Sequence, residues 1–334
     1  MLQSILSCPG LARHGYAPRA RSACCRTRSL ACCSTANPAA SVTTVTAPEQ
    51  KVPPKSSVFR FRHFDLAHGK CAQKMGTDSM LLGAWAQPPP ETQTILDVGT
   101  GTGVLALMMA QKTQHSRAAV HAIDIDAAAY QQAADNFAAS PWPDRLLLAH
   151  ASFQQWAAAA PCKYDLIISN PPFFLQSSKP DRSARAAARH ADDVLPFPQL
   201  AAGAAALLQP SGRLCLVLPP VEGQRFVQEA VQHGLLLTRS LHVFTKAQDE
   251  EPKRHIMQFE LAEHCCNAAA QQLECAAGSS SSSSSSAVER LVVMQKVTDP
   301  VSGRQQQLYS EQYQQLTADF HHPSLFKPVL TIYS

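Results

Sequence analysis

The sequence predicts an α/β fold built around a doubly wound sheet, and three observations lead to this class. Short apolar runs alternate with longer helical runs through residues 94–261, which is typical of strands joined by covering helices. A strand, a glycine loop and a helix follow one another at residues 94–107. A second buried strand runs into an Asn-Pro-Pro-Phe turn at residues 170–173. In open sheets of this class, ligands bind where neighbouring strands end.

The predicted elements follow in chain order. Strands are expected at residues 94–98, 119–123, 146–149, 163–169, 213–218, 236–244 and 255–261. Helices are expected between them at residues 104–112, 127–139, 197–208 and 224–232. A returning strand is expected near the C-terminus, at residues 289–293.

The first predicted strand leads into a glycine loop, Asp97-Val98-Gly99-Thr100-Gly101-Thr102-Gly103. Glycines let backbone N–H groups approach a ligand at the start of the following helix. A dinucleotide fingerprint would need glycine at Val104 and normally lacks an acid at Asp97. The loop resembles instead the S-adenosylmethionine loop of class I methyltransferases. Asp124 ends the next strand at the right distance to bond a ribose diol, with a solvated carboxylate as the alternative.

The Asn-Pro-Pro-Phe turn is shaped to hold a planar NH2 group. Two prolines force the chain out of the sheet, which leaves Asn170 at the tip of the strand. Its side-chain oxygen and the carbonyl of Pro171 can both accept hydrogen bonds from an amine, and Phe173 offers a ring for stacking. The alternative is a proline-rich loop after a core strand.

Residues 59–260 and 289–320 resemble the bacterial valine-tRNA adenine N6-methyltransferase family. The glycine loop and the Asn-Pro-Pro-Phe turn are shared by many methyltransferases. Narrower matches point to this family, namely Lys74 to Trp85, Ser140-Pro141-Trp142 and Tyr309-Ser310-Glu311-Gln312-Tyr313. The resemblance implies methyl transfer from S-adenosylmethionine to N6 of the adenine immediately 3′ of a tRNA anticodon.

The resemblance also implies a seven-stranded, Rossmann-like class I methyltransferase sheet in which strands 94–98 and 163–169 are neighbours. It assigns catalysis to Asn170, Pro171, Pro172 and Phe173. It assigns cofactor binding to Thr77, Asp97, Gly99, Thr100, Gly101, Gly103, Asp124, Ser152 and Asn170. Ser152 stands where the family has an acid that contacts the cofactor's adenine amine, so its hydroxyl would accept that bond more weakly. Asp126 and Gln154 are candidates to compensate.

A tRNA anticodon arm is the expected partner, because extruding a base costs less in a loop than in a duplex. Basic side chains recur at spacings of three to four after the turn, at Lys179, Arg182, Arg185 and Arg189. This run is the candidate contact to RNA phosphates. The alternative, a solvated basic face, carries equal weight, because the chain beyond residue 50 is formally neutral.

The first fifty residues carry five arginines and one acid and are rich in Ser, Ala and Thr. This composition predicts an organelle transit peptide, with a chloroplast favoured over a mitochondrion. The alternative is an unstructured cytosolic extension. No apolar run is long enough to span a bilayer, so a soluble protein without membrane contact is expected.

The expected organisation has four parts. Residues 1–57 form a disordered leader and linker, and residues 58–262 a methyltransferase domain. Residues 263–287, with the run Ser279–Ser286, form a disordered insertion, and residues 288–334 complete the domain. The cysteines show no metal-ligand spacing, so no metal is expected, and His68, His121 and His150 are expected to be structural or surface residues rather than catalysts. The protein is expected to be monomeric.

Three rival functions remain. A protein glutamine N5-methyltransferase would also present a flat NH2 to this turn, although that family has tyrosine where Phe173 stands. A non-catalytic RNA-binding relative is disfavoured by the intact Asp97, Asp124 and Asn170, and kept open by Ser152. A nicotinamide oxidoreductase is excluded mainly by Val104 and Asp97.

Overall fold

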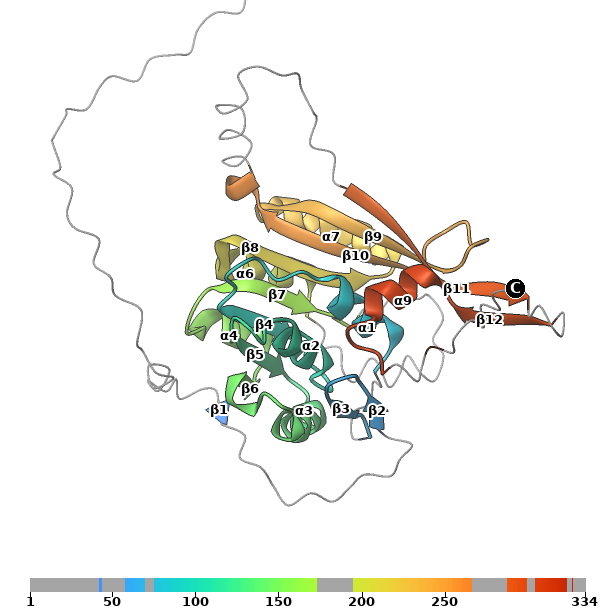
Figure 1. Ribbon diagram of the computed structural model, residues 1–334. Coiled ribbons are helices and arrows are strands. Elements are labelled where there is room, and N and C mark those ends of the chain that lie inside the picture. Colours follow the sequence, from blue (N-terminus) through green and yellow to red (C-terminus); the bar gives the residue numbers. More distant parts are fainter. Residues whose placement is uncertain are drawn as a thin grey trace, which may run out of the picture. The chain divides into compact units, whose positions relative to one another are not determined.

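A computed structural model describes residues 42–43, 58–69, 75–172, 195–265, 287–298, 304–322 and 326. The chain divides into two units, residues 1–36 and 37–334, and every described residue belongs to the second. Figure 1 shows this unit as a central sheet with helices packed on it. Phe173 and most of the predicted insertion lie outside the described residues.

The seven predicted strands form the centre of the sheet. They are β4 (Thr94–Val98), β5 (Ala119–Asp124), β6 (Leu146–His150), β7 (Tyr164–Ser169), β8 (Leu208–Leu218), β9 (Leu235–Lys246) and β10 (Arg254–Leu261). They pair in the order β6-β5-β4-β7-β8-β10-β9. The first five are parallel, and β10 is antiparallel to both neighbours. The expected adjacency of β4 and β7 is therefore observed, and the strand order reverses between them.

The sheet has ten strands rather than seven, because three more pair with its edges. β11 (Ala287–Thr298), which contains the predicted returning strand, adds parallel to β9. β12 (Gln305–Tyr309) then pairs antiparallel with β11, and this hairpin is labelled at the sheet's end in Figure 1. At the other edge, β1 (Val42–Thr43) pairs with β6, so these two residues of the expected disordered leader join the sheet.

Helices cover both faces of the sheet. One face packs against α1 (Thr77–Trp85), α2 (Val104–Lys112), α3 (Ala127–Ala139) and α9 (Glu311–Thr317). The other packs against α4 (Phe153–Ala159), α6 (Phe197–Leu207) and α7 (Pro220–Gln232). In β4, Ile95 faces the first core and Leu96 the second, as the two-residue period of a strand requires. Burial on both faces explains the unbroken apolar runs of the central strands.

The N-terminal hairpin of β2 (Val58–Arg60) and β3 (Asp65–Ala67) lies beside α3. The Asn136 carboxamide joins the two, since its Oδ1 accepts from Ala67 N at 3.0 Å and its Nδ2 donates to Ala67 O at 2.8 Å. Nδ2 also donates to Thr102 O in the glycine loop at 2.7 Å. The hairpin, α3 and the loop are thus held as one unit.

The predicted boundaries of several elements need correction. Leu208, expected to end a helix, instead begins β8 opposite Tyr164. The helix expected from Gln224 begins four residues earlier, at Pro220, where proline is favoured because the first helical N–H has no partner. Helices α1, α4 and α9, the 3-10 turn Pro143–Arg145, and the strands β1, β2, β3 and β12 were not predicted. Within the described residues, no helix has the length and apolarity to cross a membrane.

Candidate functional site

The glycine loop between β4 and α2 is fixed by hydrogen bonds to the end of β5. The N–H groups of Gly99 and Thr100 both donate to Ile123 O at 3.0 Å. Gly101 N donates to Asp124 Oδ2 at 2.8 Å. The two predicted cofactor elements, the loop and the acid of the second strand, are therefore in direct contact.

Asp97 lies beneath the loop and is completely buried. Its Oδ2 accepts from the Thr100 hydroxyl at 2.6 Å and from Ala106 N in the first turn of α2 at 3.0 Å. Its Oδ1 is buried without a partner among the described residues. Burial raises the pKa of Asp97 to about 7, against the lowering effect of these two bonds. The carboxylate thus braces the loop and also keeps one unused acceptor.

Asp124 sits at the end of β5 and is 9% exposed. Its second oxygen, Oδ1, accepts from Asp126 N at 2.9 Å. Burial raises the pKa of Asp124, opposed by the backbone N–H groups of Asp126 and Gly101. Each carboxylate oxygen has a further lone pair, so these contacts still allow bonds to a diol.

The glycines of the loop divide into two kinds. Gly99 and Gly101 have φ of +69° and +58°, and a Cβ added at either would meet no atom within 4 Å. Open space therefore lies against the loop at both positions. Gly103, with φ of +83°, differs because its Cβ would lie 2.5 Å from Phe137 Cε1. Glycine at 103 allows α2 to begin close to α3, whereas glycine at 99 and 101 leaves room beside the loop.

Asn170 follows β7 at the same edge of the sheet. Ser169 pairs with Val98 of β4, and its hydroxyl donates to Val98 O at 2.8 Å. The Asn170 Nδ2 donates to Ser79 Oγ in α1 at 2.9 Å, and no donor among the described residues contacts its Oδ1. Pro171 is buried and Pro172 is exposed. Within the described residues, the turn therefore presents an amide oxygen without a donor beside the glycine loop.

Helix α1 carries two residues of the site, Thr77 and Ser79. Thr77 is exposed at the first position of the helix, and Ser79 is 8% exposed. The sequence pointed to Thr77 through a family resemblance and missed Ser79. The contact between Ser79 and Asn170 joins residues 91 apart, so no local pattern in the sequence reveals it.

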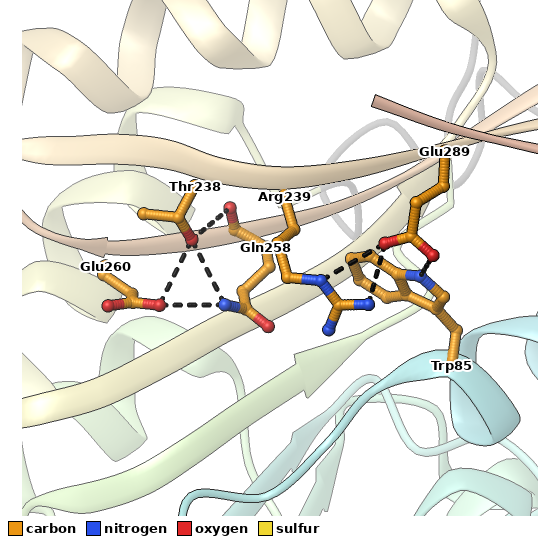
Figure 2. Close-up of polar contacts among 6 residues, drawn as sticks. All are labelled: Trp85, Thr238, Arg239, Gln258, Glu260 and Glu289. Carbon is orange, nitrogen blue, oxygen red and sulfur yellow. Dashed lines mark hydrogen bonds and ion pairs between the residues drawn. The ribbon is translucent and has the colours of Figure 1, made fainter. Parts of the chain in front are cut away.

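Both ends of α1 are held by charged side chains. Near its start, Arg254 Nε donates to Asp78 Oδ2 at 2.7 Å. At its end, the Arg239 guanidinium lies 4.5 Å from the centre of the Trp85 ring, a cation–π contact. Glu289 of β11 bridges the pair, accepting from Arg239 Nη2 at 2.8 Å and from Trp85 Nε1 at 3.4 Å (Figure 2). α1 is therefore tied to β9, β10 and β11.

Ser152 has a structural role. It caps the N-terminus of α4, where its Oγ accepts from Gln155 N at 3.2 Å and Gln155 Oε1 accepts from Ser152 N at 3.0 Å. Asp126 likewise caps α3 by accepting from Ala129 N at 2.7 Å. Gln154 donates to Gln199. Each of these candidates for the cofactor's adenine amine is already engaged in one local contact.

His121 is structural, as expected. Its Nδ1 lies 2.9 Å from the Tyr164 hydroxyl, which also accepts from Trp156 Nε1 at 3.0 Å. Burial lowers the pKa of His121 to about 4, so the ring is neutral at physiological pH. This network joins β5, β7 and α4 under the site.

Some predicted residues cannot be placed. Phe173 and the basic run Lys179, Arg182, Arg185 and Arg189 lie outside the described residues, and their roles stay predictions. Among residues with described positions, no three His, Cys, Asp or Glu side chains gather as metal ligands would.

Comparisons with known proteins identify similar chains. The model of the family described as Methyltransferase small domain matches residues 71–234. The tRNA1(Val) (adenine(37)-N6)-methyltransferase of Phocaeicola vulgatus is 40% identical over 208 residues, which cover 62% of this chain and 86% of that protein. The protein of the same name from Trichodesmium erythraeum is 39% identical over 199 residues, which cover 60% of this chain and 82% of that protein. Among solved structures, a predicted O-methyltransferase from Agrobacterium tumefaciens covers 73% of this chain and 96% of its own, with 14% identity and a TM-score of 0.47.

The buried Asp97 predicts a pH dependence of stability. Between its unfolded pKa of 3.8 and its folded pKa of about 7, the folded protein keeps a proton that the unfolded chain has released. The stabilisation that Asp97 contributes is fully present below its unfolded pKa of 3.8, and it is lost as the pH rises through its folded pKa of about 7. Urea unfolding of the ligand-free protein from about pH 4 to 8 should show this decline. Asp97→Asn should lose it, and equal pH profiles of the two proteins would contradict the assignment.

Proposed function

The chain belongs to the tRNA1(Val) (adenine(37)-N6)-methyltransferase family, and we propose that it transfers a methyl group from S-adenosylmethionine to N6 of an adenine in tRNA. One observation of the site carries this conclusion. The Asn170 oxygen accepts from no described residue, and it lies at the edge where the glycine loop and Asp124 also end. An acceptor for an amine therefore lies at the same edge of the sheet as the predicted cofactor-binding residues.

The residues present fit S-adenosylmethionine, the methyl donor of class I methyltransferases. The open space against Gly99 and Gly101 leaves room for the ligand at the backbone. Asp124 would accept from the ribose hydroxyls, and the unpartnered Oδ1 of Asp97 is an acceptor beneath the loop. When bound, the cofactor supplies a methyl group on a positively charged sulfonium. Two nearby carboxyl groups favour such a cation.

The adenine that accepts the methyl group needs to be positioned by the protein more than it needs a base to remove a proton. The lone pair of adenine N6 is conjugated into the ring, so the amine must be turned toward the methyl group. Asn170 Oδ1 and the Pro171 carbonyl would each accept one N–H, and Phe173 would stack on the base. The nitrogen becomes acidic once methylated and releases its proton without a strong base. Orientation and hydrogen bonding therefore supply most of the rate enhancement.

The finer substrate is part of the proposal. The relatives' name places the methyl group on adenine 37 of tRNA1(Val). We propose the adenine 3′ of the anticodon here as well, with the anticodon arm as the bound part of the RNA. The run Lys179, Arg182, Arg185 and Arg189 is the proposed phosphate contact on this side.

Replacing Gly101 by alanine should weaken S-adenosylmethionine binding about tenfold or more, because the added methyl would occupy the space against the loop. Gly234→Ala is the matched control. Gly234 also has a positive φ, +75°, and open space around it, but it lies in the turn between α7 and β9. Both substitutions should lower the melting temperature by similar amounts. Calorimetry showing equal affinities for the two variants would contradict the proposed pocket.

Replacing Asn170 by alanine should lower kcat for tRNA methylation by about a hundredfold or more and leave the Kd for S-adenosylmethionine nearly unchanged. The reason is that its free oxygen is assigned to the acceptor amine. Mass spectrometry of nucleosides should find N6-methyladenosine in a tRNA that carries adenine after the anticodon. A tRNA with guanine there is the substrate control, and a glutamine peptide tests the rival acceptor. Full activity of Asn170→Ala, or methylation of the peptide alone, would overturn the proposal.

We further propose that residues 1–57 direct the protein to an organelle, with the chloroplast favoured. The support is composition, five arginines against one acid in the first fifty residues. Residues 1–57 fused to a fluorescent reporter should enter the organelle of a plant or algal cell. The same reporter on residues 58–334 should stay in the cytosol. A diffuse signal from the first fusion would rule out this location.

A further inference from the structure

We propose that Ser79 is a positioning residue that holds the Asn170 carboxamide with its oxygen toward the acceptor amine. This inference rests on the proposed function, and it adds a residue of α1 that neither the glycine loop nor the Asn-Pro-Pro-Phe turn contains. Asn170 Nδ2 donates to Ser79 Oγ at 2.9 Å, and Ser79 is 8% exposed. The contact is thus shielded from most of the competing water.

A carboxamide has two unlike ends, and rotation about its last side-chain bond exchanges them. To hold the adenine amine, the carboxamide must turn its oxygen toward the substrate. If its NH2 group faced the substrate instead, two donor groups would meet and no hydrogen bond could form. The bond to Ser79 engages the nitrogen end, and no described residue donates to Oδ1. A serine hydroxyl can also donate, but a bond from Ser79 to Oδ1 would turn the NH2 group toward the acceptor. The observed arrangement is the productive one.

Ser79 can fix Asn170 only if its own backbone is fixed. The neighbouring residue Asp78 is paired with Arg254 of β10 at 2.7 Å. The far end of the helix is held by the Arg239 and Glu289 contacts to Trp85 (Figure 2). Seven of the nine residues of α1, Ser79 to Trp85, are buried. Ser79 is therefore presented by a rigid element, whereas Asn170 lies in a turn between a strand and two prolines.

The test begins with Ser79→Ala. It should lower kcat for tRNA methylation about tenfold, because Asn170 is no longer held in one orientation, and leave the Kd for S-adenosylmethionine unchanged. Ser310→Ala is the matched control. Ser310 is 5% exposed, and its hydroxyl accepts from Tyr313 N at 3.1 Å, so this variant also loses a buried serine acceptor, but at the start of α9. It should lower the melting temperature without changing kcat.

A double-mutant cycle separates positioning from general destabilisation. If Ser79 acts through Asn170, adding Ser79→Ala to Asn170→Ala should change kcat no further. A tenfold loss in both backgrounds, or equal kcat values for Ser79→Ala and Ser310→Ala, would overturn the inference. In either case the proposed function would stand, because the wild type would still methylate adenine.

A second measurement does not depend on turnover. With asparagine labelled by nitrogen-15, the side-chain NH2 signal of Asn170 is identified by its loss in Asn170→Ala. The bonded proton should exchange slowly with solvent in the wild type and in Ser310→Ala, and rapidly in Ser79→Ala. Unchanged exchange in Ser79→Ala would overturn the inference. If the wild type fails to methylate adenine, the proposed function falls, and this measurement alone decides whether Ser79 holds the carboxamide.

Discussion

The parallel pairing of β4 with β7 is the constraint on which the site depends. The ladder runs from Ile95 opposite Leu166 to Val98 opposite Ser169, and the Ser169 hydroxyl closes it on Val98 O. Both strands end together, so the glycine loop and Asn170 emerge at one edge. Because side chains alternate along a strand, a shift of one residue would move Leu166 and Ile168 from the first core to the second, move Ile167 the other way, and offset the ends of β4 and β7. The relative placement of the two motifs is thus set by the burial of the whole sheet.

Burial also disfavours the charged form of two carboxyl groups at this edge of the sheet. Asp97 and Asp124 are both taken out of water, and desolvation is the largest cause of the raised pKa of each. Backbone N–H groups and the Thr100 hydroxyl offset part of this effect, yet one oxygen of Asp97 has no partner among the described residues. Removing the acids would relieve the desolvation but would also remove the side-chain bonds to Thr100, Gly101 and Ala106, which leaves only the backbone bonds to Ile123 O to hold the loop on β5. A positively charged ligand bound against the loop would favour the ionised form of both groups.

Sequence reasoning located the elements whose local pattern is strong. The strand 94–98 and the helices 104–112 and 127–139 are predicted to the residue, because apolar runs and glycine breaks define them. Helix α4 was missed although Ser152 and Gln155 form a capping box, a local signal that the sequence contains. The family resemblance assigns Ser152 to the cofactor as well, and this assignment stays a prediction beside the capping role. Helix α1 was missed for a different reason. It is buried from Ser79 to Trp85, so it lacks the polar face that marks an amphipathic helix.

Strand β11, in the C-terminal part of the chain, supports one end of α1, the helix that carries Ser79. β11 follows the insertion and pairs with β9, beyond residues 71–234 that match the small methyltransferase domain. It places Glu289 against Trp85 and Arg239 at the end of α1, and the start of the same helix holds Ser79 against Asn170. The Arg239–Glu289 pair is partly exposed, and such pairs add little to stability. The main effect of the Arg239–Glu289 pair is to fix the position of α1. The Arg239 guanidinium, which donates two N–H groups to Glu289 Oε1, and the Trp85 indole fix one end of a buried helix, and the other end of that helix places Ser79 against Asn170.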